Sequence, residues 1–217
     1  PSDGSPKISI QADGVTYEYN YDPNNDYKTN NFAELSGETD KWSDVENSDP
    51  LEDVSNGLDS VEAKTGERPS VMIVSRQTMN YLKKNKKIKS AILAQNVTAN
   101  IFMDDARVNE LFSSELGVNI IVYAKQYKNE DGVVSKFYPD GFATLIPSGA
   151  LGNTWYGTTP EERALMGSKE ADVSIVNTGV AVAVTVSNDP VQTKTTVSEI
   201  VLPSYERMDS TYVIKCY

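Results

Sequence analysis

The sequence predicts an α+β protein in which one long amphipathic helix lies on a β-sheet. Three observations lead to this prediction: a helical apolar stripe after Asp49-Pro50, strand-like alternation in residues 7–21, and a strictly alternating valine run at residues 180–186. A mixed α/β region between the helix and the last strands completes the expected architecture. With 217 residues and 39% hydrophobic content, the chain can bury a core in one or two domains.

Residues 7–21 predict a β-hairpin that turns at Asp13-Gly14. The apolar residues that alternate along its strands are Ile8, Ile10, Val15, Tyr17, Tyr19 and Tyr21. Residues 22–40 are polar and rich in turn formers, which predicts an extended arm that is flexible when alone and adds little to a core. We expect residues 1–41 to form this hairpin and arm, packed on the main domain or on a neighbouring subunit. The start at Pro1 suggests a trimmed or processed fragment.

Residues 50–65 predict the long helix. Asp49 suits the N-cap, Pro50 the first helical position, and Gly66 the left-handed position after the helix. The apolar stripe consists of Leu51, Val54, Leu58 and Val61. From this pattern alone, an ordinary surface helix on a globular core is the simplest interpretation.

Residues 70–176 predict an inserted mixed α/β domain. A strand at 71–74 precedes a helix capped by Ser75, and a second helix starts at Asp104 or Asp105 and ends at Gly117. Strands are expected at 118–123, 135–138 and 142–147, and another helix at Pro160. The lysine cluster at 83–89 favours a solvated helix end over a nucleic-acid site, because it contains no arginine and only one aromatic residue adjoins it.

Residues 177–217 return to strand patterns. The valine run at 180–186 alternates with small residues, and further strands are expected at 193–203 and 211–217. We expect these strands to form the sheet under the long helix. Residues 42–69 and 177–217 would then make one domain, interrupted by residues 70–176.

The composition excludes several classes of enzyme. The chain has no histidine, so it lacks the commonest general base and zinc ligand. Its single cysteine, Cys216, is expected to be a small apolar strand residue, and no apolar run is long enough to span a bilayer. The acid pairs Glu52-Asp53 and Asp104-Asp105 fit first helical turns better than a catalytic pair. No catalytic, cofactor or metal site is therefore predicted, and the net charge of −11 argues against free DNA affinity.

An ordered set of short motifs carries a family resemblance. The set is Trp42-Ser43-Asp44, Asp49-Pro50, Thr65-Gly66-Glu67-Arg68-Pro69, Tyr123, Tyr127, Gly132, Phe137-Tyr138-Pro139, Ile146-Pro147, Leu151-Gly152, Tyr156-Gly157-Thr158-Thr159-Pro160-Glu161, Asp189-Pro190-Val191 and Leu202-Pro203. In this order, over about residues 7–217, the sequence resembles the major capsid proteins of tailed bacteriophages, in the lambda-type capsid E group with the HK97 fold.

The resemblance implies a structural subunit. Copies would form pentamers and hexamers of an icosahedral shell that encloses DNA without reading its sequence, with possible scaffolding, portal or decoration proteins as further partners and no membrane. The helix at 50–65 would be the spine helix of a peripheral domain, residues 70–176 the axial domain, and residues 7–21 part of a loop over an adjacent subunit. Family members usually carry a further N-terminal arm, and the lysine–asparagine cross-link of some relatives cannot be mapped here.

The expected location is the virion capsid, after assembly in the host cytoplasm. Within the axial domain, residues 148–160 are a candidate for a loop near the symmetry axis. The residues expected at assembly interfaces are Tyr17, Tyr19, Tyr21, Trp42, Trp155, Tyr156, Gly157, Thr158, Thr159 and Pro160. Two other classes remain open from the sequence: a different phage or surface assembly module, and an enzyme.

Overall fold

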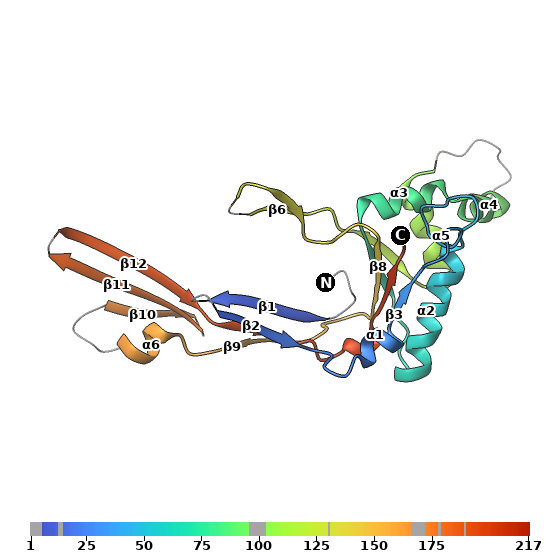
Figure 1. The fold of residues 1–217 in the computed structure, drawn as a ribbon. Coiled ribbons are helices and arrows are strands. Elements are labelled where there is room, and N and C mark those ends of the chain that lie inside the picture. The colour runs from blue at the N-terminus through green and yellow to red at the C-terminus, as the bar shows by residue number, and fades with distance from the viewer. Residues whose placement is uncertain are drawn as a thin grey trace. The chain divides into compact units, whose positions relative to one another are not determined.

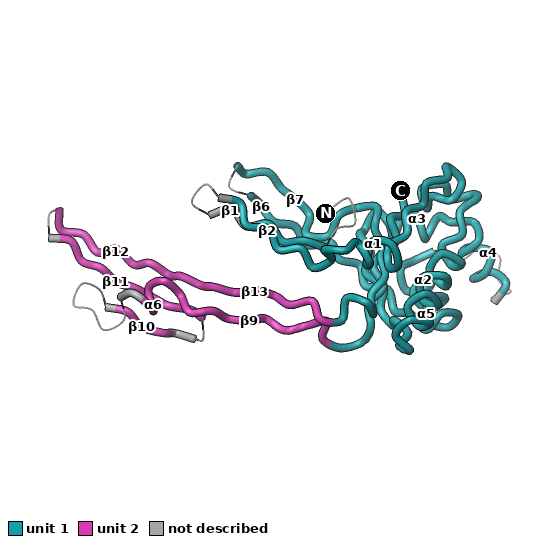
Figure 2. Tube along the Cα trace, turned by 60° about the horizontal axis from the view of Figure 1, so that its bottom comes forward, with its two compact units in different colours: residues 1–149, 207–217 teal, residues 150–206 magenta. Residues whose placement is uncertain are grey.

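The computed structural model describes residues 6–12, 15–95, 103–129, 131–165, 172–177, 179–188 and 190–217 (Figure 1). The chain divides into two compact units (Figure 2). Unit 1 comprises residues 1–149 and 207–217, and unit 2 comprises residues 150–206.

Unit 1 is built on a five-stranded mixed sheet with the strand order β3-β14-β8-β4-β5. The strands are β3 (Phe32–Glu34), β4 (Val71–Val74), β5 (Asn119–Val122), β8 (Phe142–Ile146) and β14 (Tyr212–Lys215). β14 runs parallel to β3 and antiparallel to β8, while β4 runs antiparallel to β8 and parallel to β5. The sheet therefore joins the first, middle and last parts of the chain.

Helix α2 (Pro50–Thr65) has the bounds predicted for a helix over residues 50–65. Asp49 caps it by accepting a hydrogen bond from the Glu52 amide, and Gly66 takes the left-handed conformation with φ 71°. Val54, Leu58 and Val61 are fully buried, as the stripe predicted. At Gly57 the helix approaches the sheet so closely that a Cβ would lie 2.9 Å from Tyr212 Cδ1, so α2 packs on β14.

Three further helices complete the body of unit 1: α3 (Arg76–Lys84), α4 (Lys86–Gln95) and α5 (Asp105–Leu116). Ser75 caps α3 and Asp104 caps α5, as predicted. Met79 of α3, Ile88 of α4 and Phe112 of α5 are buried in one apolar core with Leu58 of α2. Cys216 is also in this core, where burial raises the pKa of its thiol well above the usual value.

The segment 22–40 packs on the main domain, one of the two expected places, but it has more regular structure than the predicted extended arm. This segment contains α1 (Asp26–Asn30) and the sheet strand β3. Tyr27 is buried and its hydroxyl lies 3.0 Å from Thr211 Oγ1, while the side-chain amide of Asn31 donates to the Thr211 carbonyl at 2.7 Å. The segment is integrated because its few apolar and amide groups pair with the far end of the chain.

The predicted domain boundaries also differ from the observed units. A division between residues 69 and 70 would cut through the single core that holds Leu58 with Met72 and Phe112. Of the three strand segments expected under the helix, only β14 at the end of the chain belongs to the five-stranded sheet. The valine strand at 180–186 lies in unit 2.

Two hairpins belong to unit 1. The predicted N-terminal hairpin is confirmed as β1 (Lys7–Ala12) paired antiparallel with β2 (Val15–Asn20), and its turn residues lie outside the described ranges. The second hairpin pairs β6 (Gln126–Lys128) with β7 (Val134–Lys136) around the turn predicted at Asp131-Gly132.

Unit 2 contains a three-stranded antiparallel sheet of β10 (Asp172–Asn177), β11 (Val180–Asn188) and β12 (Val191–Glu199). Helix α6 (Pro160–Leu165) packs against β10 and β11, and Ala181 and Ala183 are buried. A two-stranded ribbon of β9 (Thr154–Tyr156) and β13 (Val201–Pro203) and the short 3₁₀ helix η1 (Met208–Ser210) of unit 1 complete the described elements. The predicted helix neighbour of β11 within its own unit is therefore α6.

Candidate assembly surfaces

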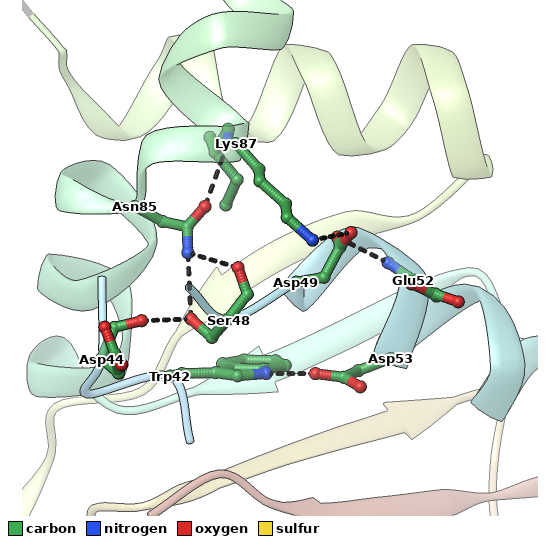
Figure 3. A network of polar contacts seen from close by, with 9 residues as sticks. Trp42, Asp44, Ser48, Asp49, Glu52, Asp53, Asn85 and Lys87 are labelled. Atoms are coloured by element: carbon green, nitrogen blue, oxygen red, sulfur yellow. Dashed lines mark hydrogen bonds and ion pairs between the residues drawn. The ribbon is translucent and has the colours of Figure 1, made fainter. Parts of the chain in front are cut away.

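The segment that enters α2 is fixed by a polar network (Figure 3). Trp42 is fully buried, and its indole Nε1–H donates to Asp53 Oδ2 at 2.8 Å. The Trp42 amide also donates to the Cys216 carbonyl at 2.9 Å. Trp42 therefore joins the end of the chain to the first turn of α2.

Asn85 connects the same segment to the start of α4. Its side-chain amide donates to both the carbonyl and the hydroxyl of Ser48 at 3.1 Å, and its side-chain oxygen accepts the Ile88 amide at 3.1 Å. Lys87 then forms an ion pair with Asp49 at 2.7 Å (Figure 3). Burial opposes the ionisation of Asp49, but its contacts with Lys87 and with the Glu52 amide hold its pKa below the usual value.

A shallow acidic hollow of about 260 Å³ lies beside this network. It is lined by Leu35, Thr39, Asp40, Asn47, Ser48, Asp49, Glu52, Asp53 and Lys87. Burial raises the pKa of Asp53, and the carboxylates of Asp49, Asp40 and Glu52 raise it further, while the Trp42 hydrogen bond opposes the rise. The hollow is therefore a place of concentrated negative charge.

The structure removes Trp42 from the predicted interface set. Its side chain is 0% exposed and takes part in the core, so it cannot contact another molecule in this fold. Thr159 is buried for a similar reason, because its hydroxyl accepts the Glu162 amide at the start of α6. Both residues are structural: one fixes the entry to α2 and the other the first turn of α6.

The tyrosines of the N-terminal hairpin lie at the surface of the chain. Tyr17 is 61% exposed and Tyr19 is 53% exposed, while Tyr21 is half-buried with its ring 4.8 Å from that of Tyr19. The register pairs Tyr19 with Ile8, and alternate residues share a face, so Tyr17, Tyr19 and Tyr21 lie on the Ile8 face of the hairpin. Their role at an interface stays a prediction.

The remaining candidates lie together in unit 2. Trp155 and Tyr156 of β9 are 61% and 49% exposed, and Thr158 and Pro160 are exposed in the connection to α6. Gly157 packs against Ile200, where a Cβ would lie 2.9 Å from the Ile200 side chain. Exposure of two large aromatic side chains is compatible with an interface but does not identify the partner.

Two exposed apolar features were missed from the sequence. The first is the β6–β7 hairpin, where Tyr127, Val133, Val134 and Phe137 are all exposed. The second is on β11 and β12, where Val186, Val191 and Val197 are 64%, 85% and 65% exposed. Strand alternation was visible at both places, but alternation alone does not show which strand faces lack a covering layer.

No group of three or more acidic or cysteine side chains able to hold a metal ion was found within the described ranges. Asp105 forms ion pairs with Arg76 and Lys83, so the acid pair at the start of α5 is structural. Within the same ranges, no helix combines the length and apolar character needed to cross a bilayer.

Comparison with known proteins identifies a class of phage structural protein. The family model described as phage major capsid protein E matches residues 6–214. A prophage protein of E. coli CFT073 that carries a provisional capsid assignment has a similar structure, with a TM-score of 0.64 and 20% identity over 97% of this chain and 59% of that one. A phage-related protein of Bordetella bronchiseptica RB50 has a TM-score of 0.50 and 15% identity over 86% and 56% of the two chains. No curated protein matched.

The chain belongs to the phage major capsid protein E family, because the family model covers nearly all of it. The predicted family is confirmed. The mixed α+β class is also confirmed by the structural neighbours. The chain spans a little under three fifths of the length of these solved relatives.

Proposed function

We propose that this chain is part of a major head subunit that self-assembles into the icosahedral shell around phage DNA. The observation that carries the proposal is the family match over residues 6–214. Self-assembly also accounts for the exposed apolar surfaces on both units, which a single copy leaves in contact with water.

The exposed surfaces suit association through several contacts. The tyrosine face of β1–β2, the aromatic residues of β6–β7 and the valines of β11–β12 are separate patches. A specific interface usually buries about 1,600 Å² in total, and several smaller contacts per copy can reach the same overall stability. A shell made of individually weak contacts can also correct errors while it grows.

The charge distribution supports enclosure of DNA without direct binding. Three members of the lysine cluster are paired with carboxylates: Lys83 with Asp105, Lys86 with Glu46, and Lys87 with Asp49. With a net charge of −11, the chain as a whole repels phosphate more than it attracts it. We infer that DNA is contained by the shell and not read by this protein.

The HK97 fold is the finer part of the proposal. The sequence resemblance makes α2 the spine helix of a peripheral domain and residues 70–176 the axial domain. Because residues of α2, β4, β8 and α5 are buried in one core, we favour a division in which unit 1 is one capsid domain and unit 2 contributes the extended strands. The loop at 148–160 remains the candidate for a position near the symmetry axis.

Partners and location follow from the same proposal. The principal partners are further copies, as pentamers and hexamers, with scaffolding, portal or decoration proteins as additional ones. The subunit would assemble in the host cytoplasm and remain in the virion capsid. No cofactor and no catalytic step is part of this role.

Negative-stain microscopy of the full-length gene product tests the proposal. Closed, uniform shells are expected. Tubes or small discrete oligomers would instead favour another phage or surface assembly module. If the wild type hydrolysed a substrate from a hydrolase panel, and a variant with a disrupted core did not, an enzyme would be favoured.

A further inference from the structure

The β6–β7 hairpin is an amphipathic ribbon that extends from the five-stranded sheet (Figure 1). Its register pairs Tyr127 with Ser135, and the Phe137 amide donates to the Lys125 carbonyl at 3.2 Å, which extends the ladder by one pair. Residues that are paired across the two strands point to the same face, and so do residues two apart in one strand. Lys125, Tyr127, Ser135 and Phe137 therefore lie on one face. We call this set the aromatic face of the hairpin.

The aromatic face is ordered but uncovered. The rings of Tyr127 and Phe137 are 4.8 Å apart at 46°, so they form one continuous apolar surface. Tyr127 is 46% exposed and Phe137 is 61% exposed. A preformed aromatic pair lowers the entropy lost on docking, because neither side chain has to be ordered at that moment.

The hairpin is slightly basic, in contrast to the chain as a whole. Residues 125–136 contain the lysines Lys125, Lys128 and Lys136 and the carboxylates Glu130 and Asp131, in a protein with a net charge of −11. Lys136 is paired with Asp140, while Lys125 lies on the aromatic face itself. The hairpin therefore fits a partner surface that is acidic and partly apolar.

Such a surface exists elsewhere on unit 1. Residues 34–53 contain eight carboxylates and only one lysine. The acidic hollow lies within this region, with Leu35 as an apolar residue in its wall and Asp40 and Glu52 as exposed carboxylates. Its volume of about 260 Å³ leaves room for one aromatic side chain.

We propose that the aromatic face of one copy docks into the acidic hollow of a second copy of this chain. Phe137 or Tyr127 would enter the hollow, and Lys125 would pair with Asp40 or Glu52 at its edge. The two surfaces are different patches of one chain, so the contact is heterologous and can close into rings. This inference rests on the proposed shell function and names one of its contacts.

A charge-reversal pair in the full-length gene product tests the partner directly. Lys125→Glu and Asp40→Lys should each raise the concentration needed for assembly by about tenfold or more, because each places like charges across the contact. The double variant should restore assembly, since every contact then again joins opposite charges. Lys89→Glu, the same change at an exposed lysine of α4, is the matched control. Melting temperatures verify folding, and Glu52→Lys replaces Asp40→Lys if that variant does not fold.

A second comparison tests the aromatic face. Phe137→Ser should weaken assembly, whereas Val134→Ser on the opposite face of the same hairpin should not, although Val134 is 60% exposed. Analytical ultracentrifugation and microscopy give the assembled fraction.

Three results would overturn the inference. If the wild type assembles and Lys125→Glu behaves like Lys89→Glu, the hairpin is not a contact, and the proposed function stands. If the single variants weaken assembly but the double variant does not recover, the hairpin binds another surface or protein. If the wild type never assembles, the proposed function fails and this contact fails with it.

Discussion

Replacing Trp42 with phenylalanine should lower the free energy of unfolding of unit 1 by about 3 kcal/mol. The indole is 0% exposed and donates to Asp53 at 2.8 Å. A hydrogen bond to a charged group contributes roughly 1.5–3 kcal/mol, and the smaller ring loses roughly 1 kcal/mol of packing. For a body of this size the sum corresponds to a fall in melting temperature of about 6–12 °C, measurable by circular dichroism.

A double-mutant cycle separates the hydrogen bond from the packing. In an Asp53→Ala background, Trp42→Phe should lose only the packing contribution, so the coupling energy should be about 1.5 kcal/mol or more. Glu52→Ala, at the exposed neighbouring position, is the control and should change stability little. If Trp42→Phe destabilises both backgrounds equally, the indole–carboxylate bond does not stabilise the entry to α2.

Four further predictions concern the core, the close approach of α2, the Asp53 carboxyl and the N-terminal hairpin. Leu58→Ala should lower the unfolding free energy by about 2–5 kcal/mol, and Leu58→Asp should prevent folding, because Leu58 is fully buried; normal expression with an unchanged melt would contradict this. Gly57→Ala should destabilise by about 1–3 kcal/mol despite its better helix propensity, because its Cβ would lie 3.0 Å from Leu145 Cδ1 and nearer still to Tyr212; a raised melting temperature would refute the close packing. Burial raises the pKa of Asp53 in the folded state, so as pH rises the carboxyl ionises in the unfolded state before it does so in the folded state. The free energy of unfolding of the wild type should therefore fall as pH rises, relative to that of Asp53→Asn, which does not ionise. In urea unfolding, the free energy of unfolding of Asp53→Asn minus that of the wild type should be larger at about pH 7 than at about pH 3. The same difference at both pH values would show that burial does not raise this pKa. Deletion of residues 1–21 should leave the body of unit 1 folded but weaken association; loss of the cooperative melt would instead place the hairpin in the core.

The helix ends could be predicted because their signals are local. Asp49 and Gly66 bound α2, and Asp104 and Gly117 bound α5, each through a hydrogen bond or backbone conformation that depends on a few neighbouring residues. Strand positions were also visible, because alternation of side chains is a property of the strand itself.

Strand partners could not be predicted, because pairing is not local. The alternation at 180–186 identified β11, but nothing in it distinguishes a place under α2 from the observed place between β10 and β12. Likewise, the polar composition of residues 22–40 predicted an arm, because the strand partner of β3 is β14, about 180 residues away in the sequence. Composition alone gives no sign of such a partner.

The candidate interface residues came from two sources, strand alternation for the hairpin tyrosines and the family resemblance for Trp155, and their role at an interface stays a prediction. Trp42 is buried instead, because an aromatic residue before a helix can be an interface residue or a buried anchor. Asp53 in the first turn of the helix was the sequence feature that favours a buried Trp42, because a buried indole N–H needs a hydrogen-bond acceptor. The aromatic face of the β6–β7 hairpin was missed because its residues come from two short strands on either side of a turn.

Cryo-electron microscopy of heads assembled from the full-length gene product tests the central claim most directly. The account predicts a closed icosahedral wall in which every subunit shows α2 packed on the five-stranded sheet, repeated in pentamers and hexamers. A wall without this fold, or density for the chain only in another part of the particle, would contradict it.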